Sequence, residues 1–257
     1  MERRDFLKNA IVFFPAGTVL ASLTQLAAAK DSTAVAAKSS LGDYAPDKHW
    51  YGMGIEIDKC IGCNRCVEAC KAENGVPEGP FYFRTWVERY RIRHDGEADV
   101  RCISLEPQGD RPVPEEDPDV LRSFFVPKLC NQCAKPPCVQ VCPVGATFKT
   151  PDGVVLVDSE RCIGCRYCIQ ACPYGARYLH PKTRTADKCT FCYHRITKGL
   201  NPACVEVCPT QARIFGDLRS KASRLVRFGR LNRTNVLKPA LNTEPKVYYA
   251  QLDGEVR

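Results

Sequence analysis

The sequence holds 257 residues with a formal charge of +8, and seventeen of these residues are cysteines. A chain of this length can bury an ordinary hydrophobic core, so its size excludes a mini-protein that depends on disulfides in place of a core. The cysteines are gathered in four tight groups, which excludes packing as their only purpose. The positive charge by itself would favour an anionic partner such as a nucleic acid or a membrane surface.

Residues 1–29 have the form of an export signal. Arg3 and Arg4 stand near the start, and an apolar, alanine-rich stretch follows up to Ala29. This pattern resembles the twin-arginine signal, with which bacteria export proteins that are already folded. We expect cleavage after Ala29; an uncleaved membrane anchor is the alternative, and polar residues within the stretch weaken it. Folding before export also argues against a disulfide framework, because the thiols are still reduced when the protein folds.

A polar segment rich in alanine and serine, residues 30–47, follows the signal and shows no hydrophobic period. We expect it to be a disordered linker. The folded part should begin near residue 48, because the alternating run from Met53 to Ile57 predicts a short strand.

The first and third cysteine groups share one spacing, in which two, two and three residues separate successive cysteines. They also share fillers, because Ile61-Gly62 recurs as Ile163-Gly164. A short apolar run typical of a strand precedes each group, so the two groups are copies of a duplicated unit. The members are Cys60, Cys63, Cys66 and Cys70 in the first group and Cys162, Cys165, Cys168 and Cys172 in the third.

The second and fourth groups are the same unit with a loop inserted before the third cysteine. A proline follows the last cysteine of the second, third and fourth groups, whereas Lys71 takes that place in the first group. Proline ends a short helix and turns the chain away. The members are Cys130, Cys133, Cys138 and Cys142 in the second group and Cys189, Cys192, Cys204 and Cys208 in the fourth.

This spacing is typical of cubane iron–sulfur clusters. Three cysteines spaced by two residues can wrap around three corners of a [4Fe–4S] cluster, and the fourth ligand must come from elsewhere in the chain. Zinc held by four cysteines is the alternative, but four cysteines packed as closely as in the first group would crowd a single tetrahedral ion. We therefore expect four [4Fe–4S] clusters on sixteen cysteines. Each would add a charge of about −2, which offsets the +8 and argues against a nucleic-acid partner.

Two segments and one cysteine lie outside this repeat. The insertion 81–126 has an alternating aromatic run and a proline-rich stretch, and we expect strands with a mobile loop. Cys102, within the insertion, is expected to be a buried apolar cysteine. The tail 218–257 is basic and irregular, which predicts an extended arm that packs on the domain or on a partner. No pairing of a nucleophile with a base and no glycine-rich phosphate loop occurs, so no substrate site is predicted.

Five runs between Met53 and Asp217 are specific: Leu129 to Cys133, Pro136 to Cys138, Gly164 to Cys168, Ala171 to Ala176 and Asp187 to Cys192. They resemble the four-cluster ferredoxin-type subunits of the dimethyl sulfoxide, polysulfide and tetrathionate reductase kind. The resemblance implies an α+β fold of two ferredoxin-like dicluster domains, one nested inside the other. The outer domain would combine residues 48–80 with 185–217, and the inner domain would span 127–184.

The resemblance also implies which cysteines share a cluster, because the last cysteine of each unit serves the cluster of its partner unit. The implied sets are Cys60, Cys63, Cys66 and Cys208; Cys189, Cys192, Cys204 and Cys70; Cys130, Cys133, Cys138 and Cys172; and Cys162, Cys165, Cys168 and Cys142.

The function implied by the resemblance is a relay of single electrons between a quinone-reactive integral membrane subunit and a molybdopterin catalytic subunit. The protein would have no substrate site of its own, so it would be a subunit of an enzyme complex and not an enzyme. Its own export signal implies a periplasmic location, with membrane attachment through partner subunits. The alternative is a ferredoxin-like subunit of a transmembrane quinone-linked complex that has a cytochrome or a thiol carrier in place of the molybdopterin partner.

Overall fold

The computed structural model describes residues 44–105 and 118–256. The predicted signal with Arg3 and Arg4, nearly all of the predicted linker and most of the predicted proline-rich loop lie outside these ranges. Within the described residues, no helix combines the length and the apolar character that crossing a membrane requires.

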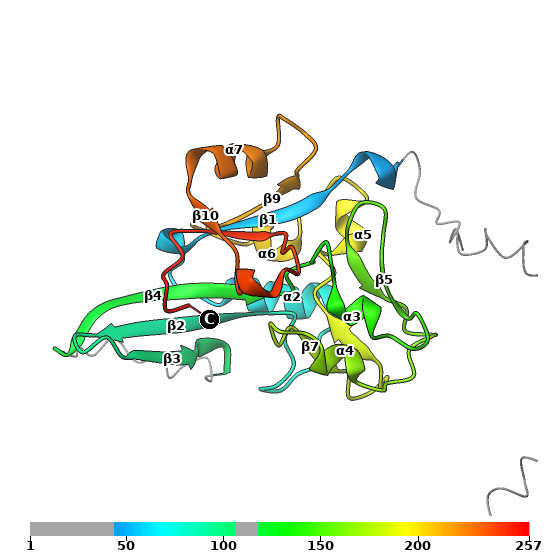
Figure 1. Ribbon diagram of the computed structural model, residues 1–257, viewed down its shortest axis with the longest axis horizontal. Coiled ribbons are helices and arrows are strands. Elements are labelled where there is room, and N and C mark those ends of the chain that lie inside the picture. Colours follow the sequence, from blue (N-terminus) through cyan, green and yellow to red (C-terminus); the bar gives the residue numbers. More distant parts are fainter. Residues whose placement is uncertain (1–43, 106–117, 257) are drawn as a thin grey trace, which may run out of the picture. The chain divides into compact units, whose positions relative to one another are not determined.

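A four-stranded sheet joins segments from both ends of the described chain (Figure 1). Its order is β10 (Thr234–Asn235), β11 (Val247–Ala250), β1 (Tyr51–Glu56) and β9 (Arg213–Asp217). Strand β1 is parallel to β11 and antiparallel to β9. Met53 and Ile55 are fully buried on one face of β1, in the same core cluster as several of the cysteines. This alternation is the signal that predicts the strand.

Helix α7 (Arg224–Leu231) packs against this sheet where β1 has glycines. A Cβ atom on Gly54 would lie 2.7 Å from the ring of Phe228, so glycine is what permits this close approach. The sequence predicts an extended arm here, and the structure adds a helix and strand β11 to that arm. The helix is hard to foresee because its buried side chains, Leu225 and Phe228, make up less than one full heptad of pattern.

The insertion forms a separate three-stranded sheet in the order β3 (Ala98–Cys102), β2 (Thr85–Arg93) and β4 (Val120–Leu129). Both β3 and β4 are antiparallel to β2, and the burial along β2 alternates, as expected for a half-buried sheet. Cys102 ends β3 opposite Glu88 and is half-buried, which is less than the sequence predicts. Strand β4 runs directly into Cys130, so the insertion also positions the second cysteine group.

Short elements surround the cysteines: five of the sixteen grouped cysteines lie in short helices, and the others lie in loops. The α-helices are α2 (Arg65–Asn74), α3 (Pro137–Gln140), α4 (Tyr167–Gln170), α5 (Tyr193–Ile196) and α6 (Ala203–Glu206). The hairpins are β5 (Thr147–Lys149) with β6 (Val155–Val157), and β7 (Arg177–Leu179) with β8 (Ala186–Lys188). Single 3-10 turns occur at Pro46–Lys48, Ile57–Lys59, Ile103–Leu105 and Pro239–Leu241.

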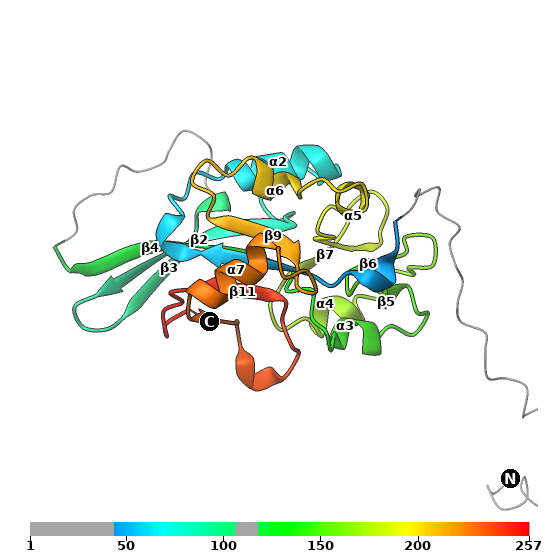
Figure 2. The ribbon, with the colours of Figure 1, turned by 90° about the horizontal axis from the view of Figure 1, so that it is seen from above.

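The helices that carry cysteines pack in two pairs. Helix α2 of the first unit packs against α6 of the fourth, and α3 of the second unit packs against α4 of the third. Figure 2 shows the two pairs on opposite sides of the molecule. The mixture of helices and strands agrees with the predicted α+β class, and the pairing places distant cysteines side by side.

Candidate metal centres

Three of the four predicted ligand sets each line a cavity. Site 1 is lined by Cys60, Cys63, Cys66 and Cys208. Site 2 is lined by Cys70, Cys189, Cys192 and Cys204. Site 3 is lined by Cys130, Cys133, Cys138 and Cys172. In each cavity three thiols come from one unit and the fourth comes from a distant unit.

The fourth set, which we call site 4, consists of Cys142, Cys162, Cys165 and Cys168. Cys162 and Cys168 pack in one small cluster together with Cys138. Cys142 lies two residues beyond α3, which packs against α4, the helix that contains Cys168. Cys165 is exposed, so this site lies nearest the surface.

The thiols of sites 1 to 3 surround their cavities and do not meet at a point. Among the described residues, no group of three or more His, Cys, Asp or Glu side chains is arranged to hold a single metal ion. A zinc site would need its ligand atoms about 2.3 Å from one ion. Four thiols line each of these cavities, so each thiol could reach a separate corner of a larger group.

Left-handed backbone conformations shape the cysteine loops. Gly62 and Asn64 in the first unit have φ of +67° and +57°, and Gly164 and Arg166 in the third unit have φ of +69° and +67°. Such turns direct successive backbone N–H groups to one side, which makes a concave site for an anion. In the fourth unit, the N–H of Phe191 donates to the Sγ of Cys189 at 3.4 Å. The residues between two cysteines therefore matter for their backbone conformation as well as for their number.

Burial controls the protonation of most of the enclosed thiols. It raises the pKa of Cys60 and Cys204 to about 11 and that of Cys133 and Cys189 to about 12. These thiols stay neutral until a cationic metal replaces the proton. Cys142 differs: burial opposes ionisation, but N–H groups from the loop that ends at Thr147 outweigh it and lower the pKa of Cys142.

Unsatisfied polar atoms test whether an anionic cofactor fits. The buried side-chain atoms that lack a hydrogen-bond partner within the described residues belong to Asn131, Arg177 and Arg213. Asn131 and Arg177 line site 3, and Arg213 lines site 1. An unsatisfied buried donor is costly, and a sulfide-bearing anion in these cavities would supply the acceptors. The residues present therefore fit iron–sulfur clusters.

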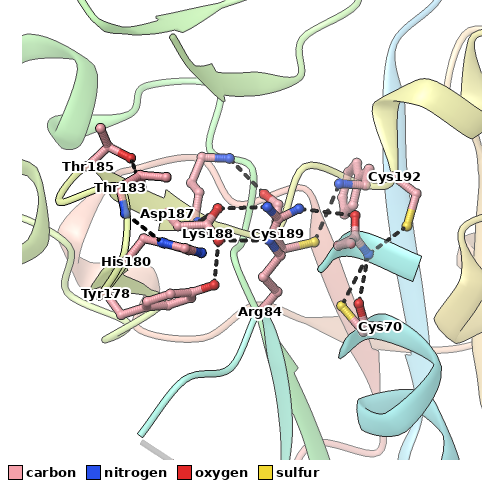
Figure 3. A network of polar contacts seen from close by, with 12 residues as sticks. Cys70, Arg84, Tyr178, His180, Thr183, Thr185, Asp187, Lys188, Cys189 and Cys192 are labelled. Carbon is pink, nitrogen blue, oxygen red and sulfur yellow. Dashed lines mark hydrogen bonds and ion pairs between the residues drawn. The ribbon is translucent and has the colours of Figure 1, made fainter. Parts of the chain in front are cut away.

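A polar network braces site 2 (Figure 3). The Nδ2 of Asn74 lies 3.6 Å from the Sγ atoms of both Cys70 and Cys192. Arg84 donates to the Oδ1 of Asn74 at 3.0 Å and forms an ion pair with Asp187 at 2.9 Å. This series of contacts thus fixes the orientation of an amide that donates to two thiols of the same site.

The sites follow one another in the order of their numbers. Burial raises the pKa of Cys204 in site 2, and the neighbouring Cys66 of site 1 adds to the rise. Cys130 of site 3 acts in the same way on Cys189 of site 2. Burial tends to lower the pKa of Arg177, but the thiolates of sites 3 and 4 around it raise the pKa overall. Sites 1 and 4 are therefore the ends of the series, and sites 2 and 3 lie between them.

Several residues around the sites are absent from the sequence prediction. Arg177 and Arg213 each follow the last cysteine of their unit by five positions, within the repeated pattern Cys-Pro-x-x-Ala-Arg. This repeated pattern is a sequence signal for the two arginines. Asn74 and Arg84 carry no such signal, because their partners Cys192 and Asp187 lie more than a hundred residues away in the sequence.

Comparison with known proteins places the protein among those that bind clusters. Two family models, each described as a 4Fe-4S dicluster domain, match residues 59–146 and 121–218. Two dicluster domains correspond to four [4Fe–4S] clusters, in agreement with the predicted cofactors. The two matched ranges share residues 121–146, and the nesting of the two domains stays a prediction.

Individual relatives are similar over most of their length. The B subunit of tetrathionate reductase from Salmonella typhimurium is 42% identical over 80% of this chain and 74% of its own. The B subunit of tetrathionate reductase from Archaeoglobus fulgidus is 48% identical over 79% of this chain and 83% of its own. The B component of polysulfide reductase from Wolinella succinogenes is 38% identical over 77% of this chain and 92% of its own.

Proposed function

This protein belongs to the family of 4Fe–4S iron–sulfur subunits of the tetrathionate, polysulfide and dimethyl sulfoxide reductase kind, and we propose that it conducts single electrons along sites 1 to 4. When bound, each cluster supplies a one-electron carrier. The polypeptide encloses the sites, orients the thiols and sets the local charge. It has no substrate site of its own in this proposal.

The proposed ligands are the four cysteine sets of sites 1 to 4, with the last cysteine of each unit bound at the site of its partner unit. The observation that carries this proposal is the lining of three separate cavities by the three predicted sets. The packing of α2 on α6 and of α3 on α4 supports the same pairing. It also supports an outer domain of residues 48–80 and 185–217 around an inner domain of residues 127–184.

We further propose partners at the two ends of the series. One would be a quinone-reactive integral membrane subunit, and the other a molybdopterin catalytic subunit. Support comes from the names of the relatives, which are components of tetrathionate and polysulfide reductases. The paired residues Arg3 and Arg4 support a periplasmic location, with attachment to the membrane through the partners.

Iron and acid-labile sulfide analysis of protein prepared without oxygen tests the cofactor proposal. Four cubanes predict about sixteen irons and about sixteen sulfides for each chain. Zinc without sulfide, or thiols bridged as disulfides, would contradict it.

Purification of the intact membrane complex tests the partners. A large molybdopterin subunit should co-purify with the protein and with an integral membrane subunit. A complex that contains the clusters and a cytochrome, but no molybdopterin, would replace this partner assignment while leaving the conducting role in place.

A further inference from the structure

The described residues include four buried basic side chains without a carboxylate ion pair; Lys246 stacks on Trp50, and the other three lie beside the cysteines. Arg213, Arg177 and Lys188 expose only 2%, 5% and 0% of their surface. None of the three forms an ion pair with a carboxylate within the ranges that the structure covers. Even Asp187, which directly precedes Lys188 in the sequence, pairs with Arg84 instead. Burying a charge is costly unless an opposite charge compensates for it, so these cations require an anionic partner of another kind.

We propose that Arg213, Lys188 and Arg177 are positioning residues for electron transfer, one at each junction between consecutive sites, and that each sets the reduction potentials of the two clusters it faces. The inference rests on the proposed function, because it needs clusters in all four sites.

The two arginines occupy equivalent positions in the repeat. Arg213 follows Cys208 by five residues and donates to the Sγ of Cys66 at 3.4 Å. Arg177 follows Cys172 by five residues and donates to the Sγ of Cys138 at 3.0 Å. In both cases the acceptor is the third cysteine of the partner unit.

Each arginine also donates to a threonine hydroxyl and keeps one nitrogen without a partner. Arg213 donates to Thr85 at 2.8 Å, and Arg177 donates to Thr147 at 3.3 Å. Their unpartnered nitrogens are Nη1 and Nε, respectively. The contacts fix each guanidinium and leave one N–H donor free to bind the cluster in the cavity. This is expected for a cation whose counter-ion is the cofactor.

Each arginine faces two sites. Arg213 lines site 1, and the Thr85 hydroxyl to which it donates lines site 2. Arg177 lines site 3, and its strand β7 packs against α4, which carries Cys168 of site 4. Arg213 therefore marks the junction of sites 1 and 2, and Arg177 the junction of sites 3 and 4.

Lys188 occupies the remaining junction. Its Nζ donates to the carbonyl of Cys189, a site 2 residue, at 2.7 Å and to the carbonyl of Val155, which lines site 3. Figure 3 shows its side chain next to Cys189. The basic residues before the first and third cysteine groups behave differently: Lys59 and Arg161 lie at the surface in ion pairs with carboxylates. Of these three basic residues, each directly before a cysteine group, only Lys188 is buried, and it lies between sites 2 and 3.

The physical effect follows from charge. Reduction adds an electron to a site that is already anionic, and a nearby buried cation lowers the free energy of that state because the low-dielectric interior screens it weakly. A cation between two sites favours the electron on either one. Sites 2 and 3 each face two of the three cations, so the cations raise the potentials of these two sites more than those of sites 1 and 4.

The test is a potentiometric titration of the holoprotein, followed by electron paramagnetic resonance. The variants are Arg213→Gln, Lys188→Met and Arg177→Gln. Each should disfavour reduction of two clusters by about tenfold, which is 59 mV for a one-electron couple. Arg213→Gln and Lys188→Met should share one shifted signal, that of site 2, and Lys188→Met and Arg177→Gln should share another, that of site 3. The two arginine variants should share none.

Matched variants separate charge from structure. Lys221→Met removes an exposed cation at the start of the turn before α7 and should leave all four signals in place. Arg213→Lys and Arg177→Lys keep the charge and should stay closer to the wild type than the glutamine variants. If one variant loses iron, the other two junctions carry the test.

Two results would overturn the inference: unchanged potentials in iron-replete variants, or equal shifts of all four signals in every variant. A wild-type protein without iron and sulfide would instead overturn the proposed function.

Discussion

The first and third cysteine units have the same spacing and the same Ile-Gly turn, yet their helices differ in length. Helix α2 of the first unit runs for 10 residues, from Arg65 to Asn74, whereas α4 of the third unit has 4. The difference follows from the residue after the last cysteine, which is Lys71 in one unit and Pro173 in the other. Proline lacks the N–H that an added turn needs, and its ring would clash with the carbonyl four residues earlier.

The longer helix gives the first unit contacts that the third lacks. Gly75 caps the end of this helix with a φ of +57°, and its N–H donates to the carbonyl of Lys71. The added turn carries Asn74 to the thiols of site 2 and Glu73 to His194 and Arg195. In the third unit the position of Asn74 is taken by Ala176. The cysteine spacing thus determines the loop, while the next residue determines what the unit does to its neighbours.

The largest expected effect is the loss of iron when the last cysteine of either unit is replaced. Cys70→Ala should remove the cluster of site 2, and Cys172→Ala that of site 3, so each loses about four of about sixteen irons. Cys70→Ala combined with Cys189→Ala should lose no more iron than either alone, because both residues serve one site. Cys70→Ala combined with Cys63→Ala should lose about eight. The reverse pattern in anaerobic iron analysis would show that each unit binds its own last cysteine.

The shared Ile-Gly turn offers the second comparison. A Cβ on Gly164 would lie 2.3 Å from the backbone oxygen of Arg184, whereas a Cβ on Gly62 would lie 2.5 Å from the ring of Phe125. A side chain can move more readily than backbone, so Gly164→Ala should destabilise the protein more. Left-handed strain and overpacking together predict a loss of roughly 2–5 kcal/mol for Gly164→Ala.

Anaerobic denaturant unfolding measures this difference. Phe125→Leu should relieve part of the cost of Gly62→Ala, and this non-additivity has no counterpart at Gly164. Equal losses for the two glycine variants would mean that the surroundings of the turn do not distinguish the units.

Lys71→Pro would give the first unit the sequence feature of the third. It should end α2 near Cys70 and cost about 3 kcal/mol of stability, with a loss of helical signal in circular dichroism. Lys71→Ala is the matched control, because alanine keeps the helix and removes only the lysine contacts with Gly79 and Phe83. If the proline variant is as stable as the alanine variant, helix length does not depend on this residue.

The smallest expected effect is that of Asn74→Ala, which installs the residue of the third unit. Loss of an amide donor to Cys70 and Cys192 should make reduction of the site 2 cluster roughly fivefold less favourable, since a hydrogen bond contributes about 1 kcal/mol. A potentiometric titration should show this shift with the iron content unchanged. A shift at site 3 or site 4 instead would contradict the placement of Asn74.

The sequence predicts the parts of this structure that depend on local spacing. The Ile-Gly pairs at 61–62 and 163–164 predict the turns. The run at Met53–Ile57 predicts β1, and the repeated cysteines predict the cofactor class. Contacts between remote segments are different, because no local pattern specifies them. The ion pair of Arg84 with Asp187 spans 103 residues, and Lys188 looks like the surface residues Lys59 and Arg161 until the fold encloses it. Ligand sharing among units came from family resemblance rather than from spacing.

The pairing of strand β11 bears on the order in which the four sites can be loaded with iron. Val247–Ala250 pairs with β1, so this edge of β1 stays open until residues 247–250 have left the ribosome. The proposed ligands of sites 3 and 4 all lie between Cys130 and Cys172, and they emerge from the ribosome much earlier. We therefore expect loading of iron during biosynthesis to begin in sites 3 and 4 and to finish in sites 1 and 2, after β11 has been made.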